Sequence, residues 1–348
     1  MIALRVVGGV FAILLLAGAA RQHRHRNISR LSLIITWLVG LLIVVLAIAP
    51  VVFNPVFDVF KFKKGTGGRL IGVLLFANVV AFLLLFRNMS TIDSAARSVR
   101  MLVEALSLQS FDRTQARDLP PGQRVVVIMP AFNEAENVST VLHAMPEEVE
   151  GYAVVPLVID DASEDATSEV ARSAGALVAR LPIRRGGGLA LRVGYEIAAQ
   201  LDGVVVVTMD ADGQHVPDEM PLLVKPILAG EADMVNGSRV LGEFERESLI
   251  RHVGVHFFSW LVTVLTGSRI TDVSNGYRAI RADILNGLVL DQDQFWASEL
   301  LIEVMRQRRR ILEVPITVRA RTSGVSKKPK TFKYARNFTK AIIQTWLR

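Results

Sequence analysis

The residues from Val204 to His215 constrain the fold of this chain more than any other stretch. They begin with four consecutive valines, an apolar β-branched run that is typical of a strand buried on both faces of a parallel α/β sheet. Asp210 and Asp212 follow where this strand would end. In extended backbone their side chains project the same way, and two carboxylates held together repel each other unless a cation lies between them.

A divalent metal ion is one interpretation of this Asp-x-Asp pair. Oxygen ligands at the carboxyl end of a parallel strand suit Mg²⁺ or Mn²⁺, and Mg²⁺ binds through one or two carboxylates together with substrate phosphates. The alternative is an acidic turn exposed to solvent, which such a short motif does not exclude. The rest of the sequence must decide between the two.

Three other strand patterns lie upstream, and each runs into a loop that carries polar residues or glycines. They cover residues 125–129, 157–159 and 176–181. The first leads to Pro130 and Glu134, the second to Asp160 and Asp161, and the third to the run Arg-Arg-Gly-Gly-Gly at 184–188. Strands that alternate with helical patterns predict an α/β fold with a doubly wound parallel sheet, in which ligands gather at the carboxyl ends of the strands.

Several common motifs are absent from the 348 residues. The glycine fingerprints of dinucleotide-binding and Walker sites are missing, and there is no nucleophile elbow for a Ser/His/Asp triad and no metal-binding pair of histidines. The absence of cysteine excludes disulfides and thiolate metal sites. A metal-dependent site for a nucleotide diphosphate remains, and the net charge of +7 fits an anionic partner.

The first 110 residues are predicted to form a membrane domain. Hydrophobic residues make up 51% of the chain, its mean hydropathy is +0.37, and three apolar segments lie at 6–20, 33–53 and 70–86. About 17–25 apolar residues cross a bilayer as a helix, so three spans are expected, followed by a connecting helix at 90–106. The first segment could instead be a secretory signal. A linker is predicted at 111–123, since Pro120-Pro121-Gly122 breaks the pattern.

The charges around these segments do not set the membrane orientation. Four arginines at 21–30 favour the cytoplasmic side for the first loop, but the next loop carries Lys61, Lys63, Lys64 and Arg69. Orientation therefore has to come from the chemistry of the second domain, predicted at 124–328.

The last segment, 329–348, is predicted to form a basic amphipathic helix on the membrane surface. Apolar residues recur every fourth position, at Tyr334, Phe338, Ile342 and Trp346, and Lys333, Arg336 and Lys340 lie on the other side. A helix that packs into the protein core is the alternative interpretation.

Five motifs in the second domain together resemble those of a family 2 glycosyltransferase. They are Val127-Ile128-Met129-Pro130-Ala131-Phe132-Asn133-Glu134, Val158-Ile159-Asp160-Asp161-Ala162-Ser163, Met209-Asp210-Ala211-Asp212-Gly213-Gln214-His215, Asn236-Gly237-Ser238-Arg239 and Ser274-Asn275-Gly276-Tyr277-Arg278. Within this family the chain is most similar to polyprenyl-phosphate sugar synthases of the dolichyl-phosphate mannose synthase type, from 124 to about 328. The resemblance implies a GT-A fold and a metal at Asp210 and Asp212. The amino-terminal part resembles a small three-helix membrane domain that accompanies some of these enzymes.

The resemblance also implies a role for each motif residue. Pro130, Glu134, Asp160, Asp161 and Asp210 would bind the donor nucleotide, with Asp160 or Asp161 accepting a hydrogen bond from the base. Asp210, Asp212 and Gln214 would hold the metal, and Asp212, Arg239 and Arg251 are the predicted catalytic residues. Arg239 and Arg251 would bind the acceptor phosphate, Ser274 and Arg278 would line the sugar and acceptor end, and the loop 322–327 would cover the donor.

Two features depart from the family pattern. Arg184 and Arg185 precede the glycine turn where the family often has Asn, and the Gln-x-x-Arg-Trp motif of processive members is missing. Glu299 lies on a predicted helix, either on its surface or on the acceptor side of the site. His215, His252 and His256 are expected to be structural.

The expected activity is inverting transfer of a sugar from a UDP- or GDP-linked donor to polyprenyl phosphate, with Mg²⁺ or Mn²⁺ as cofactor. An acceptor phosphate is already an anion, so positioning and charge neutralisation would do most of the work. Nucleotide sugars are cytoplasmic, which favours a plasma-membrane protein with a cytoplasmic catalytic domain. A lipid bilayer is expected as a partner and nucleic acid is not, while a homo-oligomer is left open. The alternatives are transfer to a lipid or glycan hydroxyl and a nucleotide-binding pseudoenzyme, and the sequence does not specify the sugar or base.

Overall fold

The computed structural model describes residues 10, 13–14, 16–17, 20, 37–38, 40–41, 44–45, 68–117, 119, 121–244, 249–320 and 331–348. The chain divides into two compact units, Met1–Ser94 and Ala95–Arg348, and we describe each by itself. This boundary lies earlier than the predicted one at 110, because Val103 and Ser107 are buried within the second unit.

In the first unit the main described element is the beginning of helix α4 (Gly68–Ser110), which contains the predicted span at 70–86. Among the residues that the structure describes, no helix combines the length and apolar character needed to cross a bilayer. The predicted spans at 6–20 and 33–53 fall mainly outside the described residues. The three-span membrane domain therefore stays a prediction.

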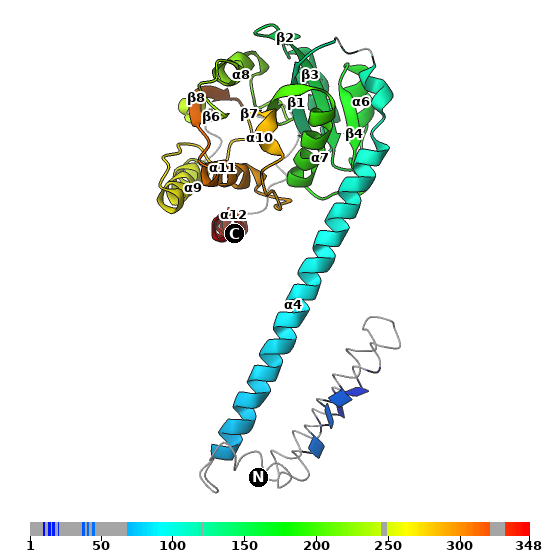
Figure 1. The fold of residues 1–348 in the computed structure, drawn as a ribbon, viewed down its shortest axis with the longest axis vertical. Helices are drawn as coiled ribbons and strands as arrows, with labels where there is room; N and C mark the ends of the chain where they lie inside the picture. Colours follow the sequence, from blue (N-terminus) through cyan, green and yellow to red (C-terminus); the bar gives the residue numbers. More distant parts are fainter. Residues whose placement is uncertain are drawn as a thin grey trace. The chain divides into compact units, whose positions relative to one another are not determined.

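The second unit is built on one mixed sheet (Figure 1). Its strands are β1 (Arg124–Ala131), β2 (Glu148–Val149), β3 (Tyr152–Asp160), β4 (Leu177–Arg180), β5 (Gly203–Thr208), β6 (Met234–Phe244), β7 (Arg278–Arg281) and β8 (Ile311–Val318). The order β4-β3-β1-β5 is parallel throughout, as the sequence predicts. Beyond β5, however, β7 is antiparallel to both of its neighbours, β5 and β6, and β8 runs parallel to β6.

The apolar strand residues divide between two cores because successive side chains of a strand point to opposite faces. Val126 and Ile128 of β1 join one core, and Val125, Val127 and Met129 join the other. Each face is covered by helices, which makes a three-layer α/β/α unit. The first core includes residues of α7 (Gly187–Gln200), α10 (Ala282–Leu285) and α11 (Trp296–Arg306), and the second includes residues of α5 (Ala135–His143), α6 (Thr167–Ser173) and α8 (Met220–Leu228).

The predicted linker is an ordered part of the second unit where the structure describes it. It contains the short helix η2 (Arg113–Ala116), and the Gln115 side chain pairs with the main chain of Val178 in β4. The carbonyl of Val178 accepts from Gln115 Nε2 at 3.3 Å, and its N–H donates to Oε1 at 2.9 Å. This pairing ties the end of α4 to the edge of the sheet.

The carboxyl-terminal helix α12 (Thr331–Leu347) differs from its prediction. Phe338 and Ile342, which were expected on a membrane surface, are only 2% and 0% exposed and belong to the first core. The Phe338 ring packs 4.4 Å from Phe258 of α9 (Leu249–Thr266) and 5.1 Å from Phe295, between ring centroids. Phe338 and Ile342 of α12 therefore face the core, and Trp346 of the same helix is 45% exposed.

Replacing Phe338 with alanine tests this packing. We expect Phe338→Ala to lower the free energy of unfolding by about 3–5 kcal/mol, the usual cost of deleting a buried aromatic ring. The measurement is denaturant unfolding of the full chain in detergent. Trp346→Ala on the same helix is the control and should cost under about 1 kcal/mol, since exposed substitutions rarely cost more. Equal losses in the two variants would contradict the buried position of Phe338.

Candidate functional site

The predicted site residues follow the carboxyl ends of β1, β3 and β5. These three strands are adjacent and parallel, in the order β3-β1-β5, so their following loops meet at one edge of the sheet. The structure thus brings together the loops that begin at Phe132, Asp161 and Met209, with Pro130 and Asp160 in the last residues of β1 and β3. Segments that lie far apart in the sequence form one candidate site.

The loops after β1 and β3 interlock through side-chain bonds to the main chain. Asn133, which has a left-handed φ of 52°, donates from its N–H to Ser163 Oγ at 2.9 Å, and its Oδ1 accepts from the Glu164 N–H at 2.8 Å. Asp160 is fully buried, and it accepts from the Ser163 N–H at 2.7 Å and from the Ser168 hydroxyl. The carboxylate of Asp160 therefore holds the loop that follows β3 in place.

Asp161 holds the glycine turn that precedes α7. Its two carboxylate oxygens each accept a backbone N–H, from Arg185 and from Gly186, both at 2.7 Å. Burial is the main influence on this carboxyl and raises its pKa, while the two N–H donors oppose that effect. Of the two neighbouring acids, Asp161 is the one that links the β3 loop to the glycine turn.

The glycines of this turn are required by close backbone contacts. Gly186 has φ of 110°, and a Cβ there would lie 2.6 Å from the carbonyl oxygen of Asp293. A Cβ on Gly188 would overlap the carbonyl oxygen of Gln292. The Gly188 N–H also donates to the Asp293 carbonyl at 2.9 Å. The turn therefore packs directly against the segment that precedes α11.

The Asp-x-Asp loop is fixed by His215. The N–H of Asp210 donates to His215 Nδ1 at 3.3 Å, so Nδ1 is the acceptor and the ring proton lies on Nε2, 3.0 Å from Asn275 Oδ1. The His215 ring also stacks on Tyr277, with 5.1 Å between centroids. As expected, His215 is structural, and it joins the Asp-x-Asp loop to the Ser274–Arg278 motif.

The carboxylates of the pair are held in different ways. Asp212 is buried, and its Oδ1 accepts from the Gln214 N–H at 3.1 Å. Asp210 faces Gly276, where a Cβ would lie 3.0 Å from Asp210 Oδ1 and 3.3 Å from the ring of Trp296. A side chain at position 276 would therefore crowd the Asp210 carboxylate.

The donor set fits a hard divalent cation that brings further oxygen ligands with its substrate. Asp210 and Asp212 supply carboxylate oxygens, whereas the Gln214 amide nitrogen donates to the Arg319 carbonyl at 3.1 Å. In the part of the chain that the structure describes, no group of three or more acidic or histidine side chains could hold a metal by itself. A site that is completed by diphosphate oxygens needs only one or two carboxylates.

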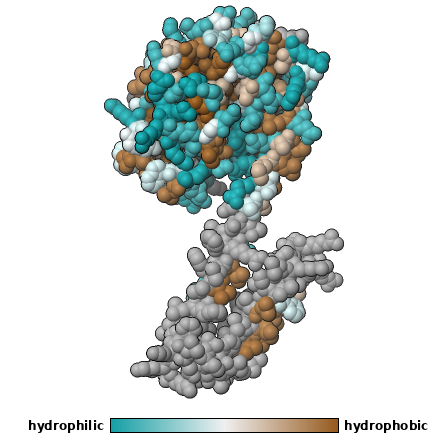
Figure 2. Space-filling view, viewed as in Figure 1, coloured by the Kyte–Doolittle hydropathy of each residue, from teal (hydrophilic) through white to brown (hydrophobic). Residues whose placement is uncertain are grey.

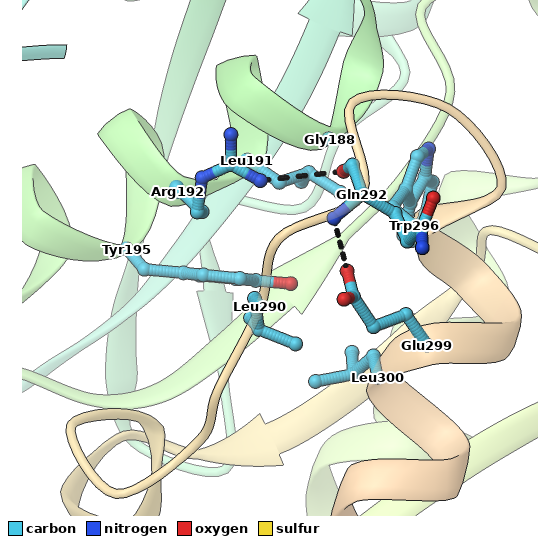
Figure 3. Close-up of a pocket in the computed structure, with 9 residues that line it drawn as sticks. All are labelled: Gly188, Leu191, Arg192, Tyr195, Leu290, Gln292, Trp296, Glu299 and Leu300. Carbon is cyan, nitrogen blue, oxygen red and sulfur yellow. Dashed lines mark hydrogen bonds between the residues drawn. The ribbon is translucent and has the colours of Figure 1, made fainter. Parts of the chain in front are cut away.

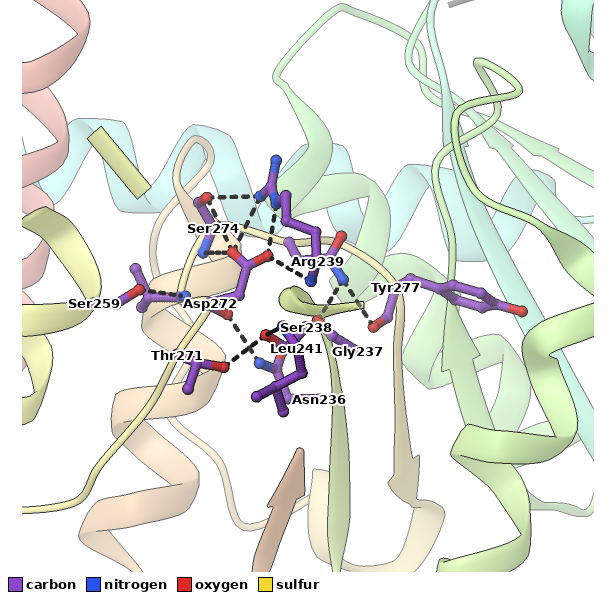
Figure 4. A network of polar contacts seen from close by, with 12 residues as sticks. Asn236, Gly237, Ser238, Arg239, Leu241, Ser259, Thr271, Asp272, Ser274 and Tyr277 are labelled. Atoms are coloured by element: carbon purple, nitrogen blue, oxygen red, sulfur yellow. Dashed lines mark hydrogen bonds and ion pairs between the residues drawn. The ribbon is translucent and has the colours of Figure 1, made fainter. Parts of the chain in front are cut away.

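Arg239 of β6 is held by a buried acid (Figure 4). Its Nε donates to Asp272 Oδ2 at 2.6 Å and its Nη2 donates to Oδ1 at 3.1 Å and to Ser274 Oγ at 2.8 Å. Asp272 is fully buried, so this fork-like pair fixes the guanidinium in one direction. The structure brings together two predicted residues here, Arg239 and Ser274.

Arg278 does not have the environment that the sequence predicts for an acceptor-binding residue. It is buried, and its guanidinium donates to the carbonyl of Ala297 and, at 2.9 Å, to the carbonyl of Val273. Burial lowers its pKa to about 10. Arg278 therefore holds the loop that carries Ser274 instead of facing a ligand. The side chain of Arg251 and the loop 322–327 lie outside the described residues, so their roles stay predictions.

The segment 290–294 is a part of the site that sequence reasoning missed (Figure 3). Glu299 is only 1% exposed, and its two oxygens accept from the N–H groups of Asp291 at 2.8 Å and Gln292 at 2.9 Å. Asp293 accepts from Arg185 at 2.7 Å and from Arg192 at 2.8 Å. The available sequence signal was a second Asp-x-Asp, at 291 and 293, ahead of a helix.

Removing the charge of Asp293 should loosen the glycine turn. Asp293→Asn removes the negative charge and leaves one acceptor oxygen for the two arginines. A hydrogen bond to a charged group is typically worth about 1.5–3 kcal/mol, so we expect the amides of Gly186 and Gly188 to exchange roughly tenfold faster or more. Hydrogen exchange read by mass spectrometry measures this. Asp283→Asn is the control, because Asp283 pairs with Arg281 on the exposed surface. Unchanged exchange in this turn would refute the bracing role of Asp293.

The part of the chain that carries this site is similar to known proteins. The family model described as glycosyl transferase family 2 matches residues 126–289. The chain is 33% identical over 215 residues to an undecaprenyl-phosphate mannosyltransferase of Micrococcus luteus, covering 59% of this chain and 87% of that protein. It is 32% identical over 223 residues to a polyprenol monophosphomannose synthase of Mycolicibacterium smegmatis, covering 60% and 82%.

Among solved structures, glucosyl-3-phosphoglycerate synthase from Mycobacterium tuberculosis, in complex with Mn²⁺, UDP-glucose and phosphoglyceric acid, is similar with a TM-score of 0.53. It is 23% identical, and the match covers 65% of this chain and 80% of that one, which shows a shared α/β fold. The sequence relationship and the fold agree with the resemblance carried by the five motifs. The chain belongs to glycosyltransferase family 2.

Proposed function

We propose that this protein is a membrane-anchored glycosyltransferase that moves a sugar from a nucleotide-sugar donor to polyprenyl phosphate with inversion. The observation that carries the proposal is the meeting of the Asp210–Asp212 loop with Arg239, a fixed cation, through the Asp272–Ser274 loop. The names of relatives from Micrococcus luteus and Mycolicibacterium smegmatis describe transfer of mannose to such lipid phosphates.

The donor would lie over the carboxyl ends of β1, β3 and β5. Asp210 and Asp212 would hold Mg²⁺ or Mn²⁺ on its diphosphate, and the ion would neutralise charge on the departing nucleoside diphosphate. Pro130, Glu134 and Asp161 would line the nucleotide. The turn at 186–188, which Asp161 fixes through the N–H groups of Arg185 and Gly186, would border the donor.

The acceptor phosphate would attack the anomeric carbon as an oxygen anion. The bond from that carbon to the nucleoside diphosphate breaks as the new carbon–oxygen bond forms, so one displacement inverts the centre. Arg239 supplies a positive charge, and Asp272 and Ser274 fix the orientation of its guanidinium. Because Asp272 offsets part of this charge, binding of a phosphate dianion calls for a second cation, the predicted role of Arg251.

Transfer to a hydroxyl acceptor would instead need a carboxylate base beside the sugar. Glu299 was the sequence candidate for an acceptor-side role, but it is buried with both oxygens accepting main-chain N–H groups. Asp210 and Asp212 are assigned to the metal, and a metal-bound carboxylate is a poor proton acceptor. The described residues thus favour an acceptor that arrives already ionised.

The proposed location is the plasma membrane, with the catalytic unit in the cytoplasm. The apolar segments at 6–20, 33–53 and 70–86 would anchor the chain, and nucleotide sugars are available on the cytoplasmic side. A lipid-linked acceptor makes membrane anchoring useful, because donor and acceptor then meet at the bilayer surface.

A radiolabel transfer assay on membranes tests the proposal. The assay offers a panel of UDP- and GDP-sugars with added polyprenyl phosphate, with Mg²⁺ or Mn²⁺ and with chelator. We expect one donor to give an organic-soluble product that is labile to mild acid, and chelator to abolish it. A product that is stable to mild acid would support a hydroxyl acceptor, and no incorporation from any donor would favour a pseudoenzyme.

In the same assay Asp212→Asn should lower turnover by about a hundredfold or more, because it removes one of two metal-binding carboxylates. The protein should stay folded, with an unchanged melting temperature. Asp218→Asn serves as control, since Asp218 is exposed a few residues further along. Retained activity of Asp212→Asn would remove Asp212 from the metal site.

Arg239→Lys separates acceptor binding from donor binding. Lysine keeps the charge but loses the planar fork that pairs with Asp272, so we expect the KM for polyprenyl phosphate to rise roughly tenfold. The KM for the donor should not change. Arg281→Lys is the matched control, because Arg281 also pairs with an acid, Asp233, at the opposite end of the β6–β7 pair. An unchanged KM for the acceptor would place Arg239 outside the acceptor site.

A further inference from the structure

The segment 290–294 is bound by arginines from two helices that lie far apart in the sequence. Arg100 is on α4, and Arg348 follows α12. Between them they contact the two acids of the segment and the buried Glu299, which holds its main chain. We name Arg100 and Arg348 the brace arginines.

Arg348 supplies the counter-charge for Glu299. Its Nη1 donates to Glu299 Oε1 at 3.0 Å and to the Val289 carbonyl at 3.0 Å, and its Nη2 lies 3.6 Å from Asp291 Oδ2. Glu299 is 1% exposed, and a buried carboxylate is costly unless a cation and hydrogen bonds satisfy it. Because the same carboxylate accepts the N–H groups of Asp291 and Gln292, the position of these two residues depends on Arg348.

Arg100 holds the same segment from α4. Its Nη1 donates to Asp291 Oδ1 at 3.3 Å, and its Nε lies 3.4 Å from Asp293 Oδ1. Glu104 comes four residues later, on the same face of the helix. It lies 3.8 Å from Arg192 Nε, and Arg192 donates to Asp293 at 2.8 Å. Two charged side chains therefore join α4 to the segment.

These contacts are more buried than ordinary surface ion pairs. Hydrophilic side chains cover much of the face of the second unit that Figure 2 shows, and an exposed ion pair usually contributes little. The side chains of Arg100, Arg192 and Arg348, in contrast, are only 19%, 10% and 25% exposed. Solvent and salt screen partly buried charges much less than exposed ones, so the acids respond strongly to the loss of one arginine.

The ion pairs are not needed to hold the helices themselves. Leu300 and Leu301 of α11 are 1% and 0% exposed in the first core. Phe338 of α12 and Val103 of α4 belong to the same core. Loss of a brace arginine should therefore leave the helices packed and release the segment 290–294.

A movement of this segment reaches the glycine turn directly. The Gly188 N–H donates to the Asp293 carbonyl at 2.9 Å, and a Cβ on Gly188 would overlap the Gln292 carbonyl oxygen. Arg185 Nη2 donates to Asp293 Oδ2 at 2.7 Å. The turn is thus fixed by Asp161 and, independently, by the segment that the brace arginines hold.

We propose that Arg100 and Arg348 are positioning residues for the nucleotide-sugar donor. They hold the segment 290–294 against the glycine turn, and this inference rests on the proposed function, in which the turn borders the donor. Neither arginine touches the donor, so the effect passes through the turn. A binding site needs its contact groups within about 0.5 Å of their working positions, which makes such distant support important.

Arg100→Ala and Arg348→Ala test the proposal on the full chain in detergent. UDP and GDP are each titrated with Mn²⁺ in a calorimeter, and we expect the nucleotide that binds to lose affinity roughly tenfold. The amides of Gly186 and Gly188 should exchange faster, and the KM for polyprenyl phosphate and the melting temperature should not change. Arg348→Lys should restore part of the affinity, because lysine keeps the charge but not the fork.

Arg310→Ala is the matched control. Arg310 also pairs with an acid, Asp233, but this pair precedes β6 and β8, at the edge of the sheet opposite the site. We expect Arg310→Ala to change neither nucleotide affinity nor exchange in the glycine turn.

Other outcomes overturn the proposal. Unchanged nucleotide affinity with faster exchange would show that the brace arginines hold the turn without positioning a donor. A lower melting temperature with faster exchange throughout the second unit would show a purely structural role. Titration needs no acceptor, so weaker nucleotide binding in the variants of a chain that transfers no sugar would contradict the proposed function and support the brace. Binding of neither nucleotide by the unaltered chain would overturn both.

Discussion

Buried carboxylates that accept main-chain N–H groups hold the loops of this site. Asp161 holds the glycine turn, and Glu299 holds the segment before α11 by the same pattern of two N–H donors. A buried carboxylate is costly unless each oxygen is satisfied, so these bonds leave each loop few alternative conformations. The turn and the segment then pack on one another through Gly186, Gly188 and Asp293. The donor side of the site depends on this chain of contacts.

On the Arg239 side of the site, a buried carboxylate likewise holds its partner, which here is a charged guanidinium. Asp272 is fully buried and binds Arg239 through two bonds, and the loop that carries Asp272 is fastened to α9. A cation that is already oriented needs little reorganisation when an anion arrives, which is the basis of electrostatic preorganisation.

Much of the fold and site follows from local sequence patterns. The buried strands, their parallel pairing up to β5 and the acids at their carboxyl ends were predicted, because strand burial and strand-end polarity are visible in short windows of sequence. Their order in the sheet was not predicted. The antiparallel β7 was not predicted, since four residues, Arg278–Arg281, carry no pattern that distinguishes strand direction. The bracing by Asp293 and Glu299 was missed because their partners are distant in the sequence and are main-chain groups.

Local sequence patterns were enough to predict the family motifs, the Asp-x-Asp pair at a strand end and the amphipathic character of α12. Tertiary structure alone decided which apolar faces are covered: Phe338 and Ile342 of α12 entered the core, while Phe257 and Trp260 of α9 stayed exposed. It likewise decided that Arg278 is buried and donates to main-chain carbonyls, and that Arg239 pairs with Asp272. The physical reason is that periodicity shows a helix has an apolar face but not whether protein or lipid meets it, because both are equally apolar.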